Sequence, residues 1–391
     1  MKLYYFIALL CSSMLFSSCL TGCQTVQQTV TTMEQNVSGT LTTTAPVQTT
    51  VTEMTTTELL KPFDYTICFS GDICIEDNAY TTQYWKSCGE DITQCIDATM
   101  IDHMRSADIC FINNEFPYST RGSATVGKDY TYRADPANVK VLPELGVDIV
   151  SLANNHAYDY GEAALLDTLD TLQNAGIPYV GAGKNLEEAS SIYYYELDGF
   201  TVAFVSGTRV EWEELTKGAT ENEPGVFRTV DPTLLYERVE EADQNADYVV
   251  VYMHWGIEGV TYLEDYQLTT GIGLMDAGAD AVIGDHTHCL QGIDFYQDKP
   301  IVYSLGNYWF NGKTMDTMLA ELHITGTAEK YEVQLQLVPA IQSNCQVTYI
   351  EDPSEQDLFY RNMENMSYGI SIDENGVVTD TDGQVPTQKP F

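Results

Sequence analysis

The sequence predicts an α/β fold in which helices cover a buried β-sheet. Short, almost continuously apolar runs alternate with helix-like segments along most of the chain after residue 60. Such runs are typical of strands that are buried on both faces, and the segments between them are typical of helical crossover connections. A polar group follows each run, at the end of the strand where open α/β sheets place their ligands.

Residues 1–22 have the pattern of a secretory signal peptide. Lys2 supplies a positive charge, the apolar run Leu3–Leu10 follows it, and serines then interrupt the apolar sequence, which disfavours a permanent transmembrane helix. The segment Leu20–Cys23 resembles a bacterial lipobox, which implies that Cys23 is lipidated. The protein is therefore expected to be extracytoplasmic and lipid-anchored to the cell membrane. Plain secretion, with Cys23 removed or left free, is the alternative.

Residues 23–60 are predicted to form a disordered, Thr-rich tether. They are rich in Thr, Val and Gln and show no sustained period of either two or 3.6. Such a segment cannot bury enough apolar surface to order itself. Removing signal and tether leaves roughly 330 residues, which suffice for one large α/β domain or two modest ones.

The composition limits the possible partners. The formal net charge is −39, which argues against nucleic acid bound through bulk charge. An anionic substrate would then need a local positive centre, for which a metal ion is the economical candidate. An odd number of cysteines follows Cys23, and Cys88 and Cys95 are close enough in sequence to form a disulfide in an extracytoplasmic protein.

The apolar runs and the helical patterns place the elements as follows. Strands are predicted at Tyr65–Phe69, Asp108–Asn113, Asp148–Leu152, Val202–Ser206, Tyr248–Met253, Ala281–Ile283 and Ile301–Tyr303. Helices are predicted near Ile92–Met104, Pro136–Leu145, Glu162–Ala175, Pro232–Asn245 and Tyr266–Ala277. Both patterns together predict a sheet with helical crossovers.

The C-terminal part is predicted to complete the sheet. Met318–Leu322 and Val333–Leu337 alternate apolar and polar residues, which predicts antiparallel strands. Asp352–Ser367 is expected to form a helix. The residues after Gly369 are expected to form a short polar tail.

Metal-binding side chains follow successive strands of the predicted sheet. They are Asp72, Glu115, Asn155, His254, His286 and His288. One such residue is a weak signal, and for the two histidines that flank Thr287 the alternative is a loop pair with no ligand. The recurrence, however, predicts that these groups meet at one edge of the sheet. Carboxylate, amide oxygen and imidazole suit one or two divalent ions such as Mn²⁺, Fe²⁺ or Zn²⁺, and paired ions can clamp and activate a phosphoryl group.

Short motifs at the ends of these strands occur in a fixed order. They are Phe69–Asp72, Asn113–Glu115, Ser151–His156 with Asp159–Gly161, Gly181–Gly183, His254–Glu258, Gly278–Gly284 and Tyr303–Asn307. In this order they resemble the calcineurin-like metallophosphoesterase superfamily. More closely, they resemble the bacterial capsule-synthesis CapA/PgsA (PGA_cap) family, which is linked to poly-γ-glutamate capsules.

The resemblance implies a fold and a domain organisation. The fold is a metallophosphoesterase-like α/β/β/α sandwich, with mixed sheets flanked by helices in a single large domain. That domain is expected to cover residues 61–350, and residues 351–391 are expected to form a C-terminal helix and tail.

The resemblance also implies roles for individual side chains. The six strand-end residues above match metal-ligand positions. His156 matches a histidine that stabilises the transition state or protonates the leaving oxygen. Arg133 resembles a family element that contacts an anionic ligand, with a salt bridge at the start of the following helix as the alternative. Asp285 is expected to orient a ligand histidine.

Two positions depart from the superfamily pattern. Cys74 occupies the place of a histidine that superfamily phosphatases usually carry at the first metal site, so one site is expected to be weak or to use Cys74 as a soft ligand. The last motif often reads Gly-His-His-Pro-His, whereas Gly284–His288 reads Gly-Asp-His-Thr-His. The His-x-His pair is retained, and Asp285 adds an acidic group beside it.

These observations predict a cell-surface lipoprotein with a metal-dependent, phosphoesterase-like hydrolase site that acts in capsule or surface-polymer assembly. Its expected partners are an anionic surface polymer or the phosphorylated precursor of that polymer, and membrane-bound capsule synthase subunits. The alternative is a non-catalytic accessory lipoprotein that binds the polymer or the synthase. A transporter's substrate-binding lipoprotein would not need polar ligands at successive strand ends.

Overall fold

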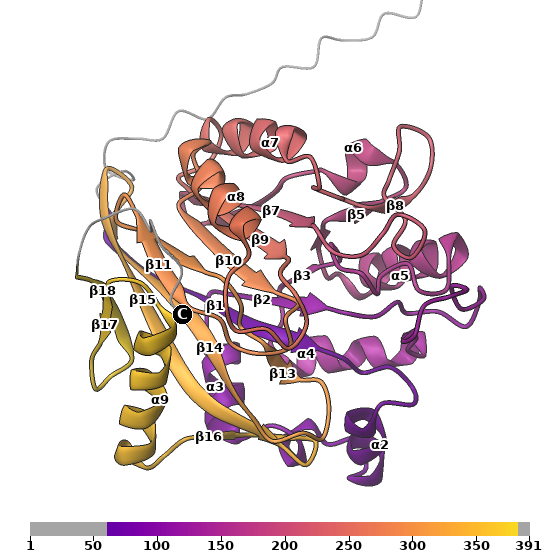
Figure 1. Ribbon diagram of the computed structural model, residues 1–391, viewed down its shortest axis with the longest axis horizontal. Helices are drawn as coiled ribbons and strands as arrows, with labels where there is room; N and C mark the ends of the chain where they lie inside the picture. Colours follow the sequence, from indigo (N-terminus) through magenta and orange to yellow (C-terminus); the bar gives the residue numbers. More distant parts are fainter. Residues whose placement is uncertain (1–60, 382–391) are drawn as a thin grey trace, which may run out of the picture. The chain divides into compact units, whose positions relative to one another are not determined.

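Two mixed β-sheets pack face to face in the computed structural model, which describes residues 61–381 (Figure 1). The predicted signal peptide, the predicted lipidation site Cys23 and the predicted tether lie outside the described residues. Among residues 61–381, no helix is both long enough and apolar enough to cross a membrane.

The first sheet is built around four parallel strands. They are β1 (Phe63–Ile73), β2 (Ile109–Asn114), β3 (Ile149–Ser151) and β4 (Tyr179–Val180). On the other side of β1, β14 and then β15 continue the sheet in antiparallel order. The first sheet is completed by β13 (Asn307–Trp309), β14 (Met315–Thr327), β15 (Lys330–Ser343), β16 (Gln346–Tyr349), β17 (Ile370–Ile372) and β18 (Val377–Asp380).

The second sheet also has a parallel centre. Its parallel strands are β7 (Phe200–Thr208), β9 (Tyr248–His254), β10 (Ala281–Asp285) and β12 (Lys299–Val302). Antiparallel strands β6 (Tyr193–Leu197) and β11 (Ile293–Tyr296) form its edges. A separate two-stranded sheet pairs β5 (Ala182–Gly183) with β8 (Gly225–Val226). Every predicted strand overlaps an observed one.

The core between the sheets follows from the two-residue period of the strands. Phe111 of β2 points inward, and its ring lies 4.8 Å from Tyr252 of β9 and 5.3 Å from Phe204 of β7. Its neighbours Cys110 and Ile112 point outward into a second core cluster beneath helices. Each central strand is therefore buried on both faces, as its continuous apolar sequence predicts.

Helices cover the outer face of each sheet (Figure 1). Those packed against the first sheet include α3 (Ala98–Ser106), α4 (Val141–Leu145) and α5 (Glu162–Ala175). Those packed against the second sheet are α7 (Thr233–Asp243) and α8 (Asp265–Asp276). The shorter elements are α2 (Tyr80–Ser87), α6 (Leu186–Ala189), and the 3₁₀ turns η1 (Ile92–Gln94) and η2 (Pro136–Lys140). The predicted α/β/β/α sandwich is confirmed.

Helix α5 illustrates how the sequence specifies these layers. Leu165, Leu169 and Leu172 recur at helical spacing and are all buried against the first sheet. The helix ends at Gly176, whose φ of 74° is left-handed, a conformation that glycine adopts without steric cost.

The helix predicted over Ile92–Met104 is interrupted. The chain forms the turn η1, breaks, and starts α3 at Ala98, where the Asp97 side chain accepts a hydrogen bond from the backbone N–H of Thr99 at 2.8 Å. Within the break, the carbonyl of Cys95 and the N–H of Asp97 bond to β16 at Val347. Pairing with a strand therefore replaces helical hydrogen bonds at this point.

The C-terminal expectation was only partly right. The predicted helix is present as α9 (Pro353–Met366). The residues expected to form a polar tail instead contain the hairpin β17–β18, and β18 pairs with β15. Val378 of this hairpin and Phe359 of α9 both lie in the core between the sheets.

Cys88 and Cys95, which are close enough in sequence to form a disulfide, do not form one. Among the described residues, every cysteine from Cys68 to Cys345 is a free thiol. Cys95 is buried, whereas Cys88 is partly exposed at the end of α2.

Candidate metal centre

The carboxyl ends of the parallel strands in both sheets bring the predicted ligands together. Asp72 lies near the end of β1, and Glu115 and Asn155 follow β2 and β3. His254 ends β9, and directly beside it the last residue of β10 leads into His286 and His288. Because parallel strands end at the same edge, residues more than 200 positions apart become neighbours.

Asp72 and His288 form one side of the centre. Asp72 is fully buried, and its Oδ2 lies 2.9 Å from Nδ1 of His288. Its Oδ1 accepts a hydrogen bond from the Asn113 side chain at 2.8 Å. Burial alone would raise the pKa of Asp72, but the bond from His288 and the nearby imidazoles outweigh it and hold the pKa below its usual value.

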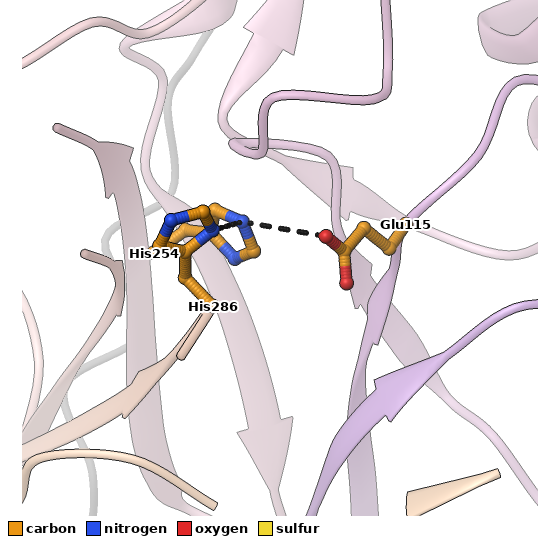
Figure 2. Close-up of side chains that lie close together, drawn as sticks. All are labelled: Glu115, His254 and His286. Atoms are coloured by element: carbon orange, nitrogen blue, oxygen red, sulfur yellow. Dashed lines mark hydrogen bonds and ion pairs between the residues drawn. The ribbon is translucent and has the colours of Figure 1, made fainter. Parts of the chain in front are cut away.

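Glu115, His254 and His286 form the other side (Figure 2). Glu115 Oε1 lies 3.6 Å from His254 Nε2, and that nitrogen lies 3.0 Å from His286 Nδ1. Figure 2 shows the carboxylate facing the two imidazoles across a short gap. Burial lowers the pKa of His254 to about 3 and lowers that of His286, so both rings are neutral, the form that binds a metal.

The donor atoms form two overlapping groups with metal-like spacing. One atom each from Glu115, His254 and His286 lie within 4.8 Å of one another, and the same holds for Asp72, Glu115 and His288. Glu115 belongs to both groups. The arrangement therefore has room for one ion or for two ions that share this carboxylate.

The state of Glu115 shows that these residues fit a cation. Both of its carboxylate oxygens are buried, and neither accepts a hydrogen bond from any donor within residues 61–381. Burial, and after it the closeness of Asp72, raises the pKa of Glu115. A buried carboxylate without a partner is costly, and a divalent ion held by oxygen and imidazole donors would satisfy it.

Asn155 extends the first donor group. Its Oδ1 lies 2.8 Å from His254 Nε2, and its Nδ2 donates to Glu211 Oε1 at 3.4 Å. Because a carboxylate can only accept, Glu211 holds the amide nitrogen on its own side. The amide oxygen of Asn155, the atom that would bind a metal, is thereby turned toward the centre.

His156 lies at the rim of the same centre. Its Nδ1 lies 2.6 Å from Asp159 Oδ2, and its Nε2 lies 3.9 Å from Glu115 Oε1. The Tyr132 ring packs against the imidazole at a centroid distance of 4.1 Å. The contact between Nδ1 and Asp159 favours the tautomer of His156 that carries its proton on Nδ1, and it leaves Nε2 directed at the centre.

The backbone of the Gly284–His288 motif is strained. His286 and His288 have φ angles of 99° and 55°, which residues other than glycine rarely adopt. Such strain persists where the surrounding structure imposes it, and it concentrates at functional sites.

A cavity of about 890 Å³ opens beside the centre. The lining residues from the centre itself are His156 and His288, with Tyr132 and Phe310 beside them. The charged residues on its wall are Glu76, Asp129, Glu211, Glu258, Lys128 and Lys313. The wall is thus mainly acidic, so an anionic ligand would depend on bound cations for a favourable potential.

Asp285 and Cys74 have contacts that the sequence did not specify. Asp285 Oδ2 accepts a hydrogen bond from the Tyr252 hydroxyl at 2.9 Å, and its Oδ1 accepts one from the backbone N–H of His286 at 3.0 Å. It therefore contacts the backbone of a histidine predicted to be a ligand, His286, rather than its ring. Cys74 is buried on the cavity wall, and burial raises the pKa of its thiol, which disfavours the thiolate that binds metals.

Arg133 lies apart from the other predicted site residues. Its guanidinium carbon lies 4.1 Å from the ring centroid of Tyr160, and Nη1 donates to the Arg121 carbonyl at 3.2 Å. It does not line the cavity described above. Its contact with an anionic ligand stays a prediction.

Sequence reasoning did not find three residues that support the centre. Asp159 was part of a matched motif, and its position three residues after His156 was the available signal. Lys128 and Glu211 lie in loops without a periodic pattern, and no local signal marks them. Their contacts depend on long-range folding.

The curated relatives of this sequence include capsule proteins. It is 34% identical over 225 residues to PGA biosynthesis protein CapA of Bacillus subtilis (strain 168), over 56% of this chain and 58% of the relative. It is 33% identical over 245 residues to Capsule biosynthesis protein CapA of Bacillus anthracis, over 58% of this chain and 57% of the relative. The chain thus spans less than two thirds of the length of each.

Among solved structures, the chain is similar to calcineurin-like phosphoesterase YfkN from Bacillus subtilis. The TM-score is 0.40 at 17% identity, over 72% of this chain and 91% of that chain. At this TM-score the similarity adds no argument to the fold and the site described above. The family match is more specific: the family described as Bacterial capsule synthesis protein PGA_cap matches residues 66–312, more than half of the chain. The chain belongs to this family of bacterial capsule synthesis proteins, as its motifs predicted.

Proposed function

We propose that this protein is a metal-dependent, phosphoesterase-like hydrolase that acts in the assembly of a capsule or another anionic surface polymer. The observation that carries the proposal is the pair of donor groups that share Glu115, a buried carboxylate with no hydrogen-bond donor among the described residues. A fold that needed only stability would not place such a group beside three histidines.

The side chains divide the work as follows. Asp72, Glu115, Asn155, His254, His286 and His288 would hold one or two divalent ions. Bound there, such ions supply Lewis-acid activation of a phosphoryl group and of water. His156 directs Nε2 toward the same centre, and Asp159 accepts a hydrogen bond from its other nitrogen, Nδ1. As an imidazolium, which carries a second proton on Nε2, His156 would be placed to give that proton to the leaving oxygen or to stabilise charge on it.

The proposed substrate is the anionic surface polymer or its phosphorylated precursor. Support comes from the names of two relatives, which refer to the biosynthesis of PGA and of capsule. The cavity beside the centre is large enough for a phosphorylated group together with part of its substituent. Because its wall is mainly acidic, the phosphate would be attracted by the bound ions and not by the wall.

The proposal includes a location and partners. We infer a lipid anchor on Cys23 and an extracytoplasmic domain held near the membrane by the segment 23–60. The support is the lipobox-like segment Leu20–Cys23 and the apolar run before it. Membrane-bound capsule synthase subunits are the proposed protein partners at that surface, and nucleic acid is not proposed.

A non-catalytic accessory lipoprotein is the second candidate. Cys74 favours this second candidate, because its neutral thiol stands where superfamily phosphatases usually carry a metal-binding histidine. The group of Asp72, Glu115 and His288 is thereby left with few donors. Such a protein would bind the polymer or the synthase without hydrolysing a phosphoester.

The two candidates are separated by measuring metal and turnover on the same sample. Purified protein is analysed for Mn, Fe and Zn and assayed with bis(p-nitrophenyl) phosphate, beside the double variant His286→Ala/His288→Ala. Metal and turnover in the parent, both lost in a variant that still melts cooperatively, are expected for the hydrolase. A folded parent that binds Mn²⁺ but never turns over the diester would favour the accessory protein.

A further inference from the structure

Lys128 places a buried ammonium group beside the metal centre. Its side chain is only 3% exposed, although Val126 on the same loop is 94% exposed. The Nζ atom lies 2.8 Å from Asp159 Oδ1 and 2.9 Å from Glu211 Oε2. Lysine is almost never buried unless it is paired, and here one ammonium pairs with two carboxylates.

Glu211, one of these two carboxylates, orients a predicted metal ligand. Glu211 accepts from Nδ2 of Asn155 at 3.4 Å, which leaves Oδ1 of that amide facing His254. Glu211 has a φ of 58°, an uncommon backbone conformation for glutamate, and the Arg228 guanidinium holds its carbonyl at 2.9 Å. The chain therefore maintains a strained residue at the point where the carboxylate must meet both Asn155 and Lys128.

Asp159, the other carboxylate, orients the acid–base candidate. Asp159 contacts Lys128 through Oδ1 and His156 through Oδ2, the latter at 2.6 Å. A third contact lies between these two: Nζ of Lys128 donates to the backbone carbonyl of Asn155 at 2.5 Å. The ammonium of Lys128 thus fixes the backbone between Asn155 and His156. It also fixes the carboxylates of Glu211 and Asp159, which direct the side chains of Asn155 and His156.

We propose that Lys128 is a positioning residue, which acts through Glu211 on Asn155 and through Asp159 on His156. This inference rests on the proposed function, because it takes Asn155 to be a metal ligand. Lys128 also lines the cavity, so direct contact with an anionic substrate is the competing role. The two roles differ in what they affect: positioning acts on metal affinity without any substrate present, whereas a substrate contact acts on KM.

Removal of the ammonium has a defined physical consequence. The carboxylates of Glu211 and Asp159 would lose the cation between them and repel each other. The Asn155 amide would then be free to rotate its oxygen away from the centre. Loss of a group that orients a metal ligand typically lowers metal affinity or activity roughly 10- to 100-fold.

The test uses the full-length protein and Mn²⁺ alone as the ligand. Lys128→Met removes the charge and retains most of the side-chain length, and Glu211→Gln is a shape-conserving second variant that removes only the carboxylate. Lys313→Met is the matched control, because Lys313 is an exposed lysine on the wall of the same cavity. The Kd for Mn²⁺ is measured by titration calorimetry, folding by thermal melts, and kcat and KM with bis(p-nitrophenyl) phosphate.

We expect Lys128→Met and Glu211→Gln to weaken Mn²⁺ binding by roughly 10- to 100-fold, and Lys313→Met to leave the Kd unchanged. Equal weakening by both lysine variants, or a change in KM alone, would overturn the proposal. If Lys128→Met does not fold, Glu211→Gln decides by the same criterion. If the parent binds Mn²⁺ but shows no turnover, only the proposed hydrolase activity is contradicted. The comparison of Kd values would still test the positioning role of Lys128. A parent that binds no Mn²⁺ overturns both.

Discussion

Replacement of Glu115 by glutamine is expected to stabilise the metal-free protein and to remove its stabilisation by metal. Glu115 is fully buried, and no described donor bonds to its oxygens. Burial and the nearby Asp72 raise its pKa, so ionisation of this group is unfavourable in the metal-free fold. Glutamine keeps the shape and removes the charge.

The expected size of the effect follows from the unpaired oxygens. A buried polar group without a partner costs about 1–3 kcal/mol, and more when it is charged. Glutamine leaves a neutral polar group at the same place and removes only the additional cost of the charge, so the free energy of unfolding of metal-free Glu115→Gln should exceed that of the parent by about 1 kcal/mol at neutral pH. Metal should reverse the order, because Mn²⁺ at about 100 times its Kd stabilises the parent by about 2.7 kcal/mol. The variant lacks the shared ligand and should gain less.

Thermal melts followed by circular dichroism can detect this reversal. For a domain of this size, 1 kcal/mol corresponds to roughly 1–2 °C in Tm. Each protein is melted in EDTA and again with Mn²⁺, and Glu240→Gln on the exposed face of α7 serves as a control with unchanged Tm in both conditions. If the parent were the more stable protein in EDTA as well, or if Mn²⁺ raised both melting temperatures equally, Glu115 would not be a metal ligand held at the cost of stability.

Three further predictions concern the rest of the fold. Glu321 Oε1 lies 2.9 Å from Nδ1 of His103 and its Oε2 lies 3.3 Å from Nε2 of His323. The carboxylate raises the pKa of both imidazoles, so their stabilisation is complete below their unfolded pKa of about 6.5 and is lost as pH rises through the folded values. In urea titrations Glu321→Gln should therefore flatten this pH dependence, by less than about 1 kcal/mol per pair because the imidazoles are partly exposed; an unchanged slope would contradict it. Phe111→Ala, in the core between the sheets, should cost about 3–5 kcal/mol in the same titration, and a loss near zero would argue against the packed core. Gly71→Ala should abolish metal binding or folding, because a Cβ there would lie 2.0 Å from a backbone carbonyl oxygen; normal Mn²⁺ affinity in this variant would refute that contact.

The layers of the fold could be predicted because the strands are buried on both faces. Phe111, Cys110 and Ile112 are all apolar, and such continuous runs separate strands from the helices between them. The failures were local. The helix predicted from Ile92 is broken where the chain pairs with β16, and the hairpin β17–β18 was missed because its strands are short and one of them depends on β15 for a partner.

The candidate centre could be predicted to the extent that its residues are fixed to strand ends. His254 and His286 follow apolar runs, so the parallel sheet itself brings them together. Lys128 and Glu211 could not be found this way, because loop residues acquire neighbours only through the complete fold. Arg133 shows the opposite outcome. It was chosen because it lies in a motif, but in the folded chain its guanidinium lies over the Tyr160 ring.

The charges beneath the cavity connect stability with function. Asp72, Glu115 and Asp285 are all fully buried, and burial raises the pKa of the last two. His288 balances one of these carboxyl groups through its contact with Asp72, while Lys128 is already paired with Asp159 and Glu211 on the far side of His156. Folding alone gains nothing from such an excess of acid in a low-dielectric interior. A divalent ion would offset it, and the same ion would give an acidic cavity the positive potential that a phosphorylated substrate requires.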